Sequence, residues 1–328
     1  MNIYDVTLRD GNHALRHQLT VDFLESYCEI ADRSGVWAVE VGHGNGLGAS
    51  SYLVGKSIAT DAQLLTAARN SLKNTKLAVH SIPGFATLQR DLIPAIDLGV
   101  DIFRVATHVT EANTAEKHIE YLANKEILVH GVLMMSHMIS INGLVEQAKM
   151  MENYGASAVI IMDSSGNYIP RDVSERVDAL KSKLKVEVGF HAHNNLGVAV
   201  SNAITAEESG ATIIDGASMG LGAGAGNAQL ENIVAISGRD NDLKKLNTFY
   251  RMSQMIENSF PENLPRVTSS SIQSGMAGVF SGYAPHVKAL AQELGIEAGT
   301  LWSEMAKRKL VAGQESMIRE IAQDLMNL

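Results

Sequence analysis

The segment VEVGFHAHNNLGVAVSNAITAEESGATIIDGAS, residues 186–218, contains one strand–helix–strand unit and decides the fold. Its two ends, 186–191 and 212–218, are short apolar runs rich in β-branched residues, as buried strands are. The stretch between them repeats apolar residues at helical spacing and ends in Gly210, a residue that commonly terminates helices. Two consecutive strands joined by a helix pair in parallel through a right-handed crossover. The segment therefore predicts a β–α–β unit.

The same alternation of strand and helix extends along the chain. Amphipathic segments separate the strands, and several of them end in glycine, at Gly35, Gly99 and Gly155. Eight such units predict a closed (β/α)8 TIM barrel, with an open doubly wound sheet as the alternative. The candidate strands are residues 2–7, 37–42, 76–81, 102–107, 127–132, 157–163, 186–191 and 212–218.

The alternation stops after Asp242. Residues 243–258 predict a helix, 260–267 a linker, and the remainder several helices that end with 315–328. We therefore expect two regions: a catalytic barrel over residues 1–240 and a helical C-terminal extension over 241–328.

Composition excludes several classes of protein. The chain has 328 residues, 45% of them hydrophobic, which is enough for one large core. A formal net charge of −9 leaves no basic surface for nucleic acid, and no apolar run is long enough to span a membrane. The single cysteine, Cys28, excludes an internal disulfide and a cysteine-rich metal site. Without a signal-peptide pattern at the N-terminus, we expect a cytoplasmic protein.

Histidines gather where the predicted strands end. A TIM barrel carries its chemistry at the C-terminal ends of its strands, because the βα loops meet there. Seven of the eleven histidines lie at or just beyond these ends: His13, His43, His80, His108, His137, His191 and His193.

The pair His191 and His193 predicts a metal site. On a strand, residues i and i+2 project from the same face, so both imidazoles can reach one ion, and Asp10 ends another strand. The alternative is one packed and one solvated histidine. Two imidazoles and one carboxylate suit an octahedral Mn²⁺, Mg²⁺ or Co²⁺ better than a closed tetrahedral Zn²⁺ site.

Arg9 and His13 accompany the predicted ligand Asp10. Arg9 is able to form an ordinary salt bridge with Glu40 on the next strand, or to stabilise an oxyanion beside the metal while Glu40 holds its guanidinium. Both interpretations can be true together. His13 is placed to move a proton, although a lone histidine in a loop is weak evidence for a base.

Two further patterns bear on the chemistry. The stretch GLGAGAGNAQLE, residues 220–231, is either a tight loop or a cradle for a phosphate or carboxylate, with Asn227 as the expected helix N-cap. Lys76 and Lys185 precede strands, and no lysine ends one, so a Schiff-base aldolase is disfavoured. The metal-dependent route is therefore favoured for carbon–carbon chemistry.

Taken together, these motifs resemble the 4-hydroxy-2-oxovalerate aldolase family, metal-dependent pyruvate aldolases of the DRE-TIM metallolyase group. TLRD (7–10) with HAH (191–193) is shared across that group, including isopropylmalate synthase and hydroxymethylglutaryl-CoA lyase. GNHALRHQ (11–18), MMSHM (134–138) and GQESMI (313–318) are typical of the aldolase branch. The resemblance runs nearly end to end.

The resemblance implies cleavage of 4-hydroxy-2-oxopentanoate to pyruvate and acetaldehyde with a divalent metal, commonly Mn²⁺. Asp10, His191 and His193 would hold the metal, which would bind the 2-oxo acid. His13 would take the proton of the C4 hydroxyl and Arg9 would stabilise the pyruvate enolate. Ser164 would help to seat the substrate carboxylate.

Two departures from the family pattern concern the aldehyde end of the substrate. The family's tyrosine in GVYS is Phe280 here, and Tyr283, three residues on, is an alternative source of that hydroxyl. The family's LLLPG reads HSIPG here, which places His80 and Ser81 where leucines line an apolar pocket. An aldehyde bearing a hydroxyl or a charge is therefore an alternative product, unless His80 is simply packed.

The resemblance also implies a partner. The family's helical C-terminal region binds an acylating aldehyde dehydrogenase that uses NAD and coenzyme A, and we expect an oligomer. Two rival functions stay open: an acyl-CoA-using condensing enzyme or lyase on the same barrel, and a non-catalytic interaction protein that retains the ligands.

Overall fold

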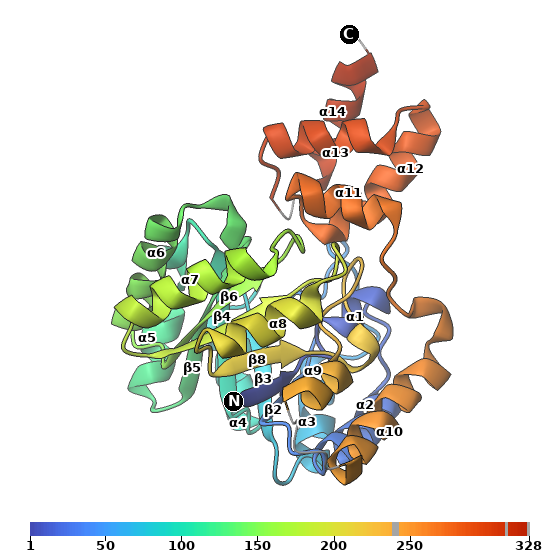
Figure 1. Cartoon of the computed structure of the whole chain (residues 1–328). Helices are drawn as coiled ribbons and strands as arrows, with labels where there is room; N and C mark the ends of the chain where they lie inside the picture. The colour runs from blue at the N-terminus through green and yellow to red at the C-terminus, as the bar shows by residue number, and fades with distance from the viewer. Residues whose placement is uncertain (238–242, 312–313, 327–328) are drawn as a thin grey trace.

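Eight parallel strands close into one barrel in the computed structural model, which describes residues 1–237, 243–311 and 314–326 (Figure 1). Each strand pairs with its neighbours in chain order, and β1 pairs with β8 to complete the circle. This confirms the TIM barrel over the open sheet. The strands are β1 (Asn2–Asp5), β2 (Ala38–Glu40), β3 (Lys76–Ser81), β4 (Ile102–His108), β5 (Leu128–Met134), β6 (Ala158–Asp163), β7 (Glu187–Ala192) and β8 (Ile213–Gly216).

Helices cover the outside of the barrel (Figure 1). Thr20, Thr60 and Ser140 begin three of them, each accepting a backbone N–H with its side-chain oxygen. No helix in the described ranges is long and apolar enough to cross a membrane. The crossing helices are α2 (Val21–Ala31), α3 (Asp61–Ser71), α4 (Ile93–Asp97), α5 (Glu116–Asn124), α6 (Ile141–Asn153), α7 (Pro170–Lys183), α8 (Ala199–Glu208) and α9 (Leu230–Ser237), and a short α1 (Gly11–Ala14) follows β1.

Alternation along each strand separates the barrel interior from the layer beneath the helices. On β6, Ala158 and Ile160 belong to the inner cluster, whereas Val159 and Ile161 pack against the helices. By the same alternation, several buried polar side chains point into the barrel interior near the C-terminal ends of the strands. They are Glu40 on β2, His80 on β3, Arg104 on β4, His191 on β7 and Asp215 on β8. The inner cluster is otherwise mostly apolar, with the buried His130 of β5 contacting the Tyr4 hydroxyl.

The C-terminal region has an apolar core of its own. Its helices α11 (Ser269–Ala277), α12 (Ala284–Leu294), α13 (Ala298–Lys307) and α14 (Glu315–Met326) stack beyond the barrel mouth (Figure 1). The preceding helix, α10 (Leu243–Ser259), instead packs Phe249, Met252 and Ile256 into the core that the barrel shares with its helices. The expected boundary after residue 240 lies outside the described residues, in 238–242, and stays a prediction.

Gly189 on β7 tests how tightly the barrel interior is packed. A Cβ at this position would lie 2.8 Å from Ile160 Cδ1 and 3.0 Å from the Ile213 carbonyl oxygen. We expect Gly189→Ala to lower the free energy of unfolding by about 1–3 kcal/mol, measured by urea denaturation, because backbone cannot move aside cheaply. Gly299→Ala, where the near neighbour is the flexible Gln273 side chain, is the control. Equal stability of the two variants would contradict this expectation.

Candidate metal centre

Arg9 is held between two buried carboxylates at the mouth of the barrel. Its Nη1 donates to Asp10 Oδ2 at 2.7 Å, and its Nε donates to Glu40 Oε2 at 2.9 Å. The expected salt bridge with Glu40 is therefore present. Arg9 Nη2 is buried and has no hydrogen-bond partner among the residues that the structure describes, so one donor nitrogen of this guanidinium stays available.

Arg104 continues the chain of charges across the barrel lumen. It is fully buried, with Nη1 3.4 Å from Glu40 Oε2 and Nη2 2.7 Å from Asp215 Oδ2. Asp215 Oδ2 in turn lies 2.8 Å from His191 Nδ1. Because a carboxylate can only accept, this contact places a proton on Nδ1 and leaves Nε2 of a neutral His191 ring as a lone pair.

His191 closes the chain into a ring, because its Nε2 lies 3.8 Å from Asp10 Oδ2. Our sequence interpretation missed the roles of Arg104 and Asp215. The signal for both was a charged residue inside an apolar strand, in IFRVAT and TIIDGAS. Such a residue must be paired to be buried.

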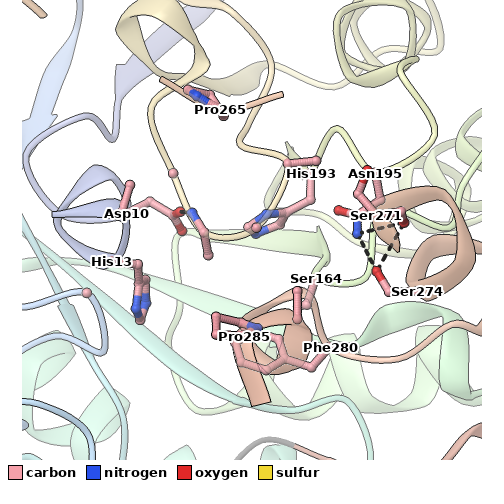
Figure 2. A pocket seen from close by; sticks show the side chains of 18 of the residues that line it. Asp10, His13, Ser164, His193, Asn195, Pro265, Ser271, Ser274, Phe280 and Pro285 are labelled. Carbon is pink, nitrogen blue, oxygen red and sulfur yellow. Dashed lines mark hydrogen bonds between the residues drawn. The ribbon is translucent and has the colours of Figure 1, made fainter. Parts of the chain in front are cut away.

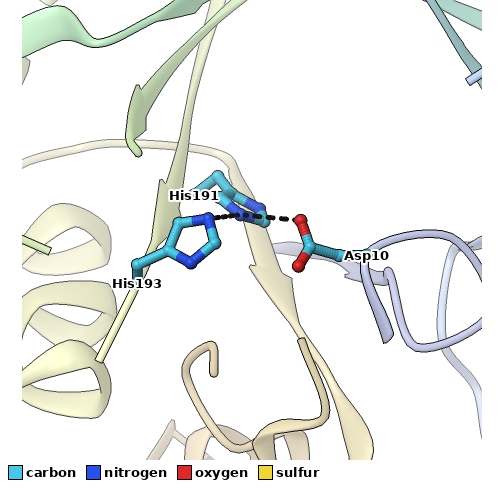
Figure 3. Close-up of side chains that lie close together, drawn as sticks. All are labelled: Asp10, His191 and His193. Carbon is cyan, nitrogen blue, oxygen red and sulfur yellow. Dashed lines mark hydrogen bonds and ion pairs between the residues drawn. The ribbon is translucent and has the colours of Figure 1, made fainter. Parts of the chain in front are cut away.

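Asp10, His191 and His193 converge on one point (Figure 3). Their ligand atoms all lie within 4.8 Å of one another, all three residues are buried, and the two Nε2 atoms are 3.3 Å apart. Around the ring, three carboxylates against two guanidinium groups leave one negative charge when His191 is neutral. This donor set of two imidazoles and one carboxylate fits a divalent cation.

Burial and charge set the protonation states of these groups. Burial alone would raise the pKa of the Asp10 carboxyl, but Arg9 and the neighbouring imidazoles hold it well below its usual value. Burial lowers the pKa of His193 to about 4 and that of His13 to about 4. Near neutral pH, Asp10 is thus ionised and both histidines are neutral, as ligation and proton abstraction require.

The glycine-rich loop after β8 cradles a carboxylate of the protein itself. Ala223 N donates to Asp10 Oδ1 at 3.0 Å, and a Cβ on Gly222 would lie 2.8 Å from the same oxygen. Asn227 is not the expected N-cap, since α9 begins three residues later at Leu230. Its backbone instead forms an isolated bridge with His193, and its Nδ2 donates to the Leu221 carbonyl at 3.3 Å, which fixes the loop beside the predicted metal ligands.

A pocket of about 1920 Å³ opens from the metal group toward the C-terminal helices (Figure 2). Of the residues predicted from sequence to contact substrate, Arg9, His13, His80, Ser164 and Phe280 all line it. The structure thus brings these five side chains and the predicted metal ligands Asp10 and His193 into one cavity.

Contacts with neighbouring residues orient two of the polar side chains that line this cavity, His80 and Ser164. His80 is buried with its Nδ1 3.5 Å from Glu40 Oε1, so it faces the ring as well as the pocket. Ser164 Oγ accepts the backbone N–H of Met135 at 3.0 Å, which orients the hydroxyl.

Tyr283 lies away from this cavity, in the core of the C-terminal region. It is 1% exposed, its hydroxyl donates to the Val311 carbonyl and accepts the Gln314 N–H at 3.1 Å. Its ring meets Phe280 edge to face at 5.7 Å between centroids. The structure therefore brings Phe280 to the site with Tyr283 behind it, and a direct catalytic role of Tyr283 stays a prediction.

Polar contacts attach the C-terminal helices to the loops that carry the site. Asn195 Nδ2, two residues after His193, donates to Ser274 Oγ at 2.7 Å (Figure 2). Asn167 Nδ2 donates to the Gly275 carbonyl at 2.8 Å. Gly275 approaches closely enough that a Cβ there would lie 2.9 Å from Asn195 Cβ. Helix α11 thus forms one wall of the pocket.

Comparison with known proteins agrees with this geometry. A family model described as HMGL-like matches residues 1–257, and one described as DmpG-like communication domain matches 265–327. The chain is 51% identical to 4-hydroxy-2-oxovalerate aldolase of Spirochaeta aurantia, covering 98% of this chain and 95% of that one. It is 48% identical to the enzyme of the same name from Pectobacterium atrosepticum, covering 98% and 94%.

Solved structures share the fold at low identity. The carboxyl transferase domain of Rhizobium etli pyruvate carboxylase superposes with a TM-score of 0.81 at 16% identity, covering 99% of this chain and 60% of that one. The N-terminal domain of a Bacteroides vulgatus protein superposes with a TM-score of 0.74 at 24% identity, covering 87% and 95%. These likenesses establish the architecture alone.

A substitution at Asp215 can test whether the ring of charges supports the predicted metal ligands. We expect Asp215→Asn to weaken Mn²⁺ binding about 10–100-fold while the chain stays folded, because His191 loses the carboxylate that fixes its tautomer. Isothermal titration with Mn²⁺ measures the affinity and circular dichroism the fold. The matched control is Asp101→Asn, whose carboxylate pairs with Arg69 at the edge of the barrel. Unchanged affinity in Asp215→Asn would refute the link.

Proposed function

We propose a reaction for this chain from the premise that it belongs to the HMGL-like family and, within it, to the 4-hydroxy-2-oxovalerate aldolases. The reaction is retro-aldol cleavage of 4-hydroxy-2-oxopentanoate to pyruvate and acetaldehyde, with Mn²⁺ as the divalent metal. The observation that carries the proposal is the buried group of Asp10, His191 and His193 at the floor of a pocket that Arg9 and His13 also line.

Asp10, His191 and His193 would hold the metal, and Mn²⁺ suits their mixed oxygen and nitrogen donors. When bound, the ion supplies Lewis-acid polarisation of the 2-oxo group. The ring around it carries one net negative charge, so a divalent cation turns the site positive and favours an anionic 2-oxo acid. Ser164 then offers its hydroxyl to the substrate carboxylate from the pocket wall.

Arg9 and His13 act on the two halves of the scissile bond. His13, neutral near pH 7, takes the proton of the C4 hydroxyl. The C3–C4 bond then breaks, its electron pair forms the enolate of pyruvate, and C4 leaves as the aldehyde carbon. The unpartnered Arg9 Nη2 is a donor for the developing oxyanion. Protonation of the enolate at C3 gives pyruvate, so the reaction needs no oxidant and no coenzyme A.

The helical region over 241–328 is the proposed docking site of an acylating aldehyde dehydrogenase that consumes the aldehyde. The match of residues 265–327 to a communication domain supports this assignment, as does the separate core of these helices. NAD and coenzyme A would belong to that partner. An oligomeric state of the aldolase itself remains our expectation.

A more polar aldehyde is a second candidate product, because of His80. This buried imidazole lines the pocket within 3.5 Å of the Glu40 carboxylate. The proposal is that His80 offers a hydrogen bond to a hydroxyl on the aldehyde, while Phe280, which lines the same pocket, supplies apolar surface.

The first experiment measures pyruvate released from 4-hydroxy-2-oxopentanoate by metal-stripped protein, with and without added Mn²⁺. We expect release that depends on Mn²⁺ and does not require coenzyme A, which also separates the aldolase from an acyl-CoA-using enzyme. Asp10→Ala should abolish Mn²⁺ binding. His13→Ala should keep Mn²⁺ and lower kcat about 10²–10⁴-fold, because only the proton transfer is lost. Protein that binds no Mn²⁺ would sink the mechanism.

The aldehyde preference is tested with His80→Leu. We expect the ratio of kcat/KM for 4,5-dihydroxy-2-oxopentanoate to that for 4-hydroxy-2-oxopentanoate to fall about tenfold, the value of one hydrogen bond. Coupled assay of pyruvate with both substrates gives the ratio. An unchanged ratio would show that His80 is a packed histidine without influence on the aldehyde.

A further inference from the structure

Three histidine rings stack at the rim of the pocket. His13 lines the cavity and meets His17 edge to face, with centroids 5.3 Å apart and planes at 69°. His17 in turn lies flat on His43, with centroids 3.6 Å apart and planes at 16°. Both His17 and His43 are buried. Only His13 has a part in the proposed reaction, so the two rings behind it need a separate explanation.

The backbone adopts an uncommon conformation to place His17. Arg16 and His17 have φ angles of 52° and 62°, in the left-handed region that non-glycine residues rarely enter. The turn returns the chain toward α1, where His17 N donates to the Asn12 carbonyl at 2.8 Å. Strained backbone of this kind persists when surrounding structure requires it, and it gathers at functional sites.

Hydrogen bonds fix the orientation of both rear rings. Gly44 N donates to His17 Nδ1 at 3.4 Å, and Asn45 N donates to His43 Nδ1 at 3.0 Å. A backbone N–H can only donate, so each Nδ1 is an acceptor and each ring carries its proton on Nε2. His43 Nε2 then donates to the Gly55 carbonyl at 3.1 Å.

Two glycines let the loops approach these rings. A Cβ on Gly44 would lie 2.6 Å from the His13 ring, and a Cβ on Gly55 would lie 2.5 Å from His17 Cδ2. The Gly44 carbonyl also accepts Arg9 Nη1 at 3.3 Å. The stack is therefore built into the same loop that touches the Arg9 guanidinium. In the described part of the chain, these three histidines do not form a metal-binding group.

We propose that His17, backed by His43, is a positioning residue that holds the His13 imidazole in the orientation in which it faces the pocket. The edge-to-face contact with His17 and the close approach of Gly44 to the His13 ring together restrict how that ring can turn. The inference rests on the proposed role of His13 as the base for the C4 hydroxyl. A proton acceptor must lie within hydrogen-bond reach of the proton it takes. Without the His17 ring, the His13 imidazole would therefore spend less time within reach of the C4 hydroxyl.

The test uses His17→Asn in the full chain, because asparagine tolerates the left-handed backbone but lacks the ring. We expect kcat for pyruvate release to fall about tenfold, with KM and Mn²⁺ affinity within twofold of wild type. Exchange of the C3 hydrogens of pyruvate for deuterium, followed by NMR, should be unchanged, because it does not involve the C4 hydroxyl. His118→Asn, on the outer helix α5, is the matched control and should behave as wild type.

A double-mutant cycle with His13→Ala decides whether His17 acts through His13. We expect His17→Asn to have no further effect on kcat in the His13→Ala background. A tenfold loss in both backgrounds would overturn the proposal, as would wild-type kcat in His17→Asn alone. Loss of deuterium exchange or Mn²⁺ affinity would also overturn it, since the residue would then be merely structural. Failure of the proposed function is distinguishable, because wild-type protein would then release no pyruvate.

Discussion

The site depends on a chain of buried, alternating charges inside the barrel mouth, which the His191 imidazole closes into a ring. It runs from Asp10 through Arg9, Glu40, Arg104 and Asp215 to His191, and back to Asp10. A buried charge is costly unless it is paired and hydrogen-bonded. Removing one charged member of this ring therefore leaves the buried charges beside it without a partner. This constraint joins Arg9, the proposed oxyanion donor, and His191, a proposed metal ligand, into one unit, although they lie far apart in the sequence.

Arg104 is the member that makes the unit possible. It spans the lumen from β4 and holds Glu40 of β2 and Asp215 of β8 at the same time. Glu40 then orients Arg9, and Asp215 orients His191. Arg9 and His191 are thus held in place by groups that are not among the residues lining the pocket, which is how a site keeps its dipoles oriented before a reaction begins. The one net negative charge of the ring would favour the binding of a divalent cation.

The pocket is lined by residues of both the barrel and the C-terminal region. Its floor is the polar layer of the barrel, and part of its wall is α11, attached through Asn195 and Asn167 in the loops after β7 and β6. Phe280 reaches the cavity from the second core, with Tyr283 behind it. Part of the pocket wall therefore comes from a region that also carries the communication-domain match, so under the proposed function substrate selection and partner docking would share one structural element.

The sequence by itself determined the barrel, the metal group and the Arg9–Glu40 pair. These depend on local patterns: apolar strands alternate with helices, His193 directly follows β7 two residues after His191, and strand ends meet at one mouth. Only the tertiary structure decided the partners of Arg104 and Asp215, the stack of His13, His17 and His43, and the placement of Tyr283 in the second core. Each of these depends on contacts that no local pattern shows, such as that of Arg104 with Asp215 across the barrel and that of His17 with His43 from the next βα loop. The sequence predicted Asn227 as a helix cap because a local pattern cannot show that its loop is recruited to cradle Asp10.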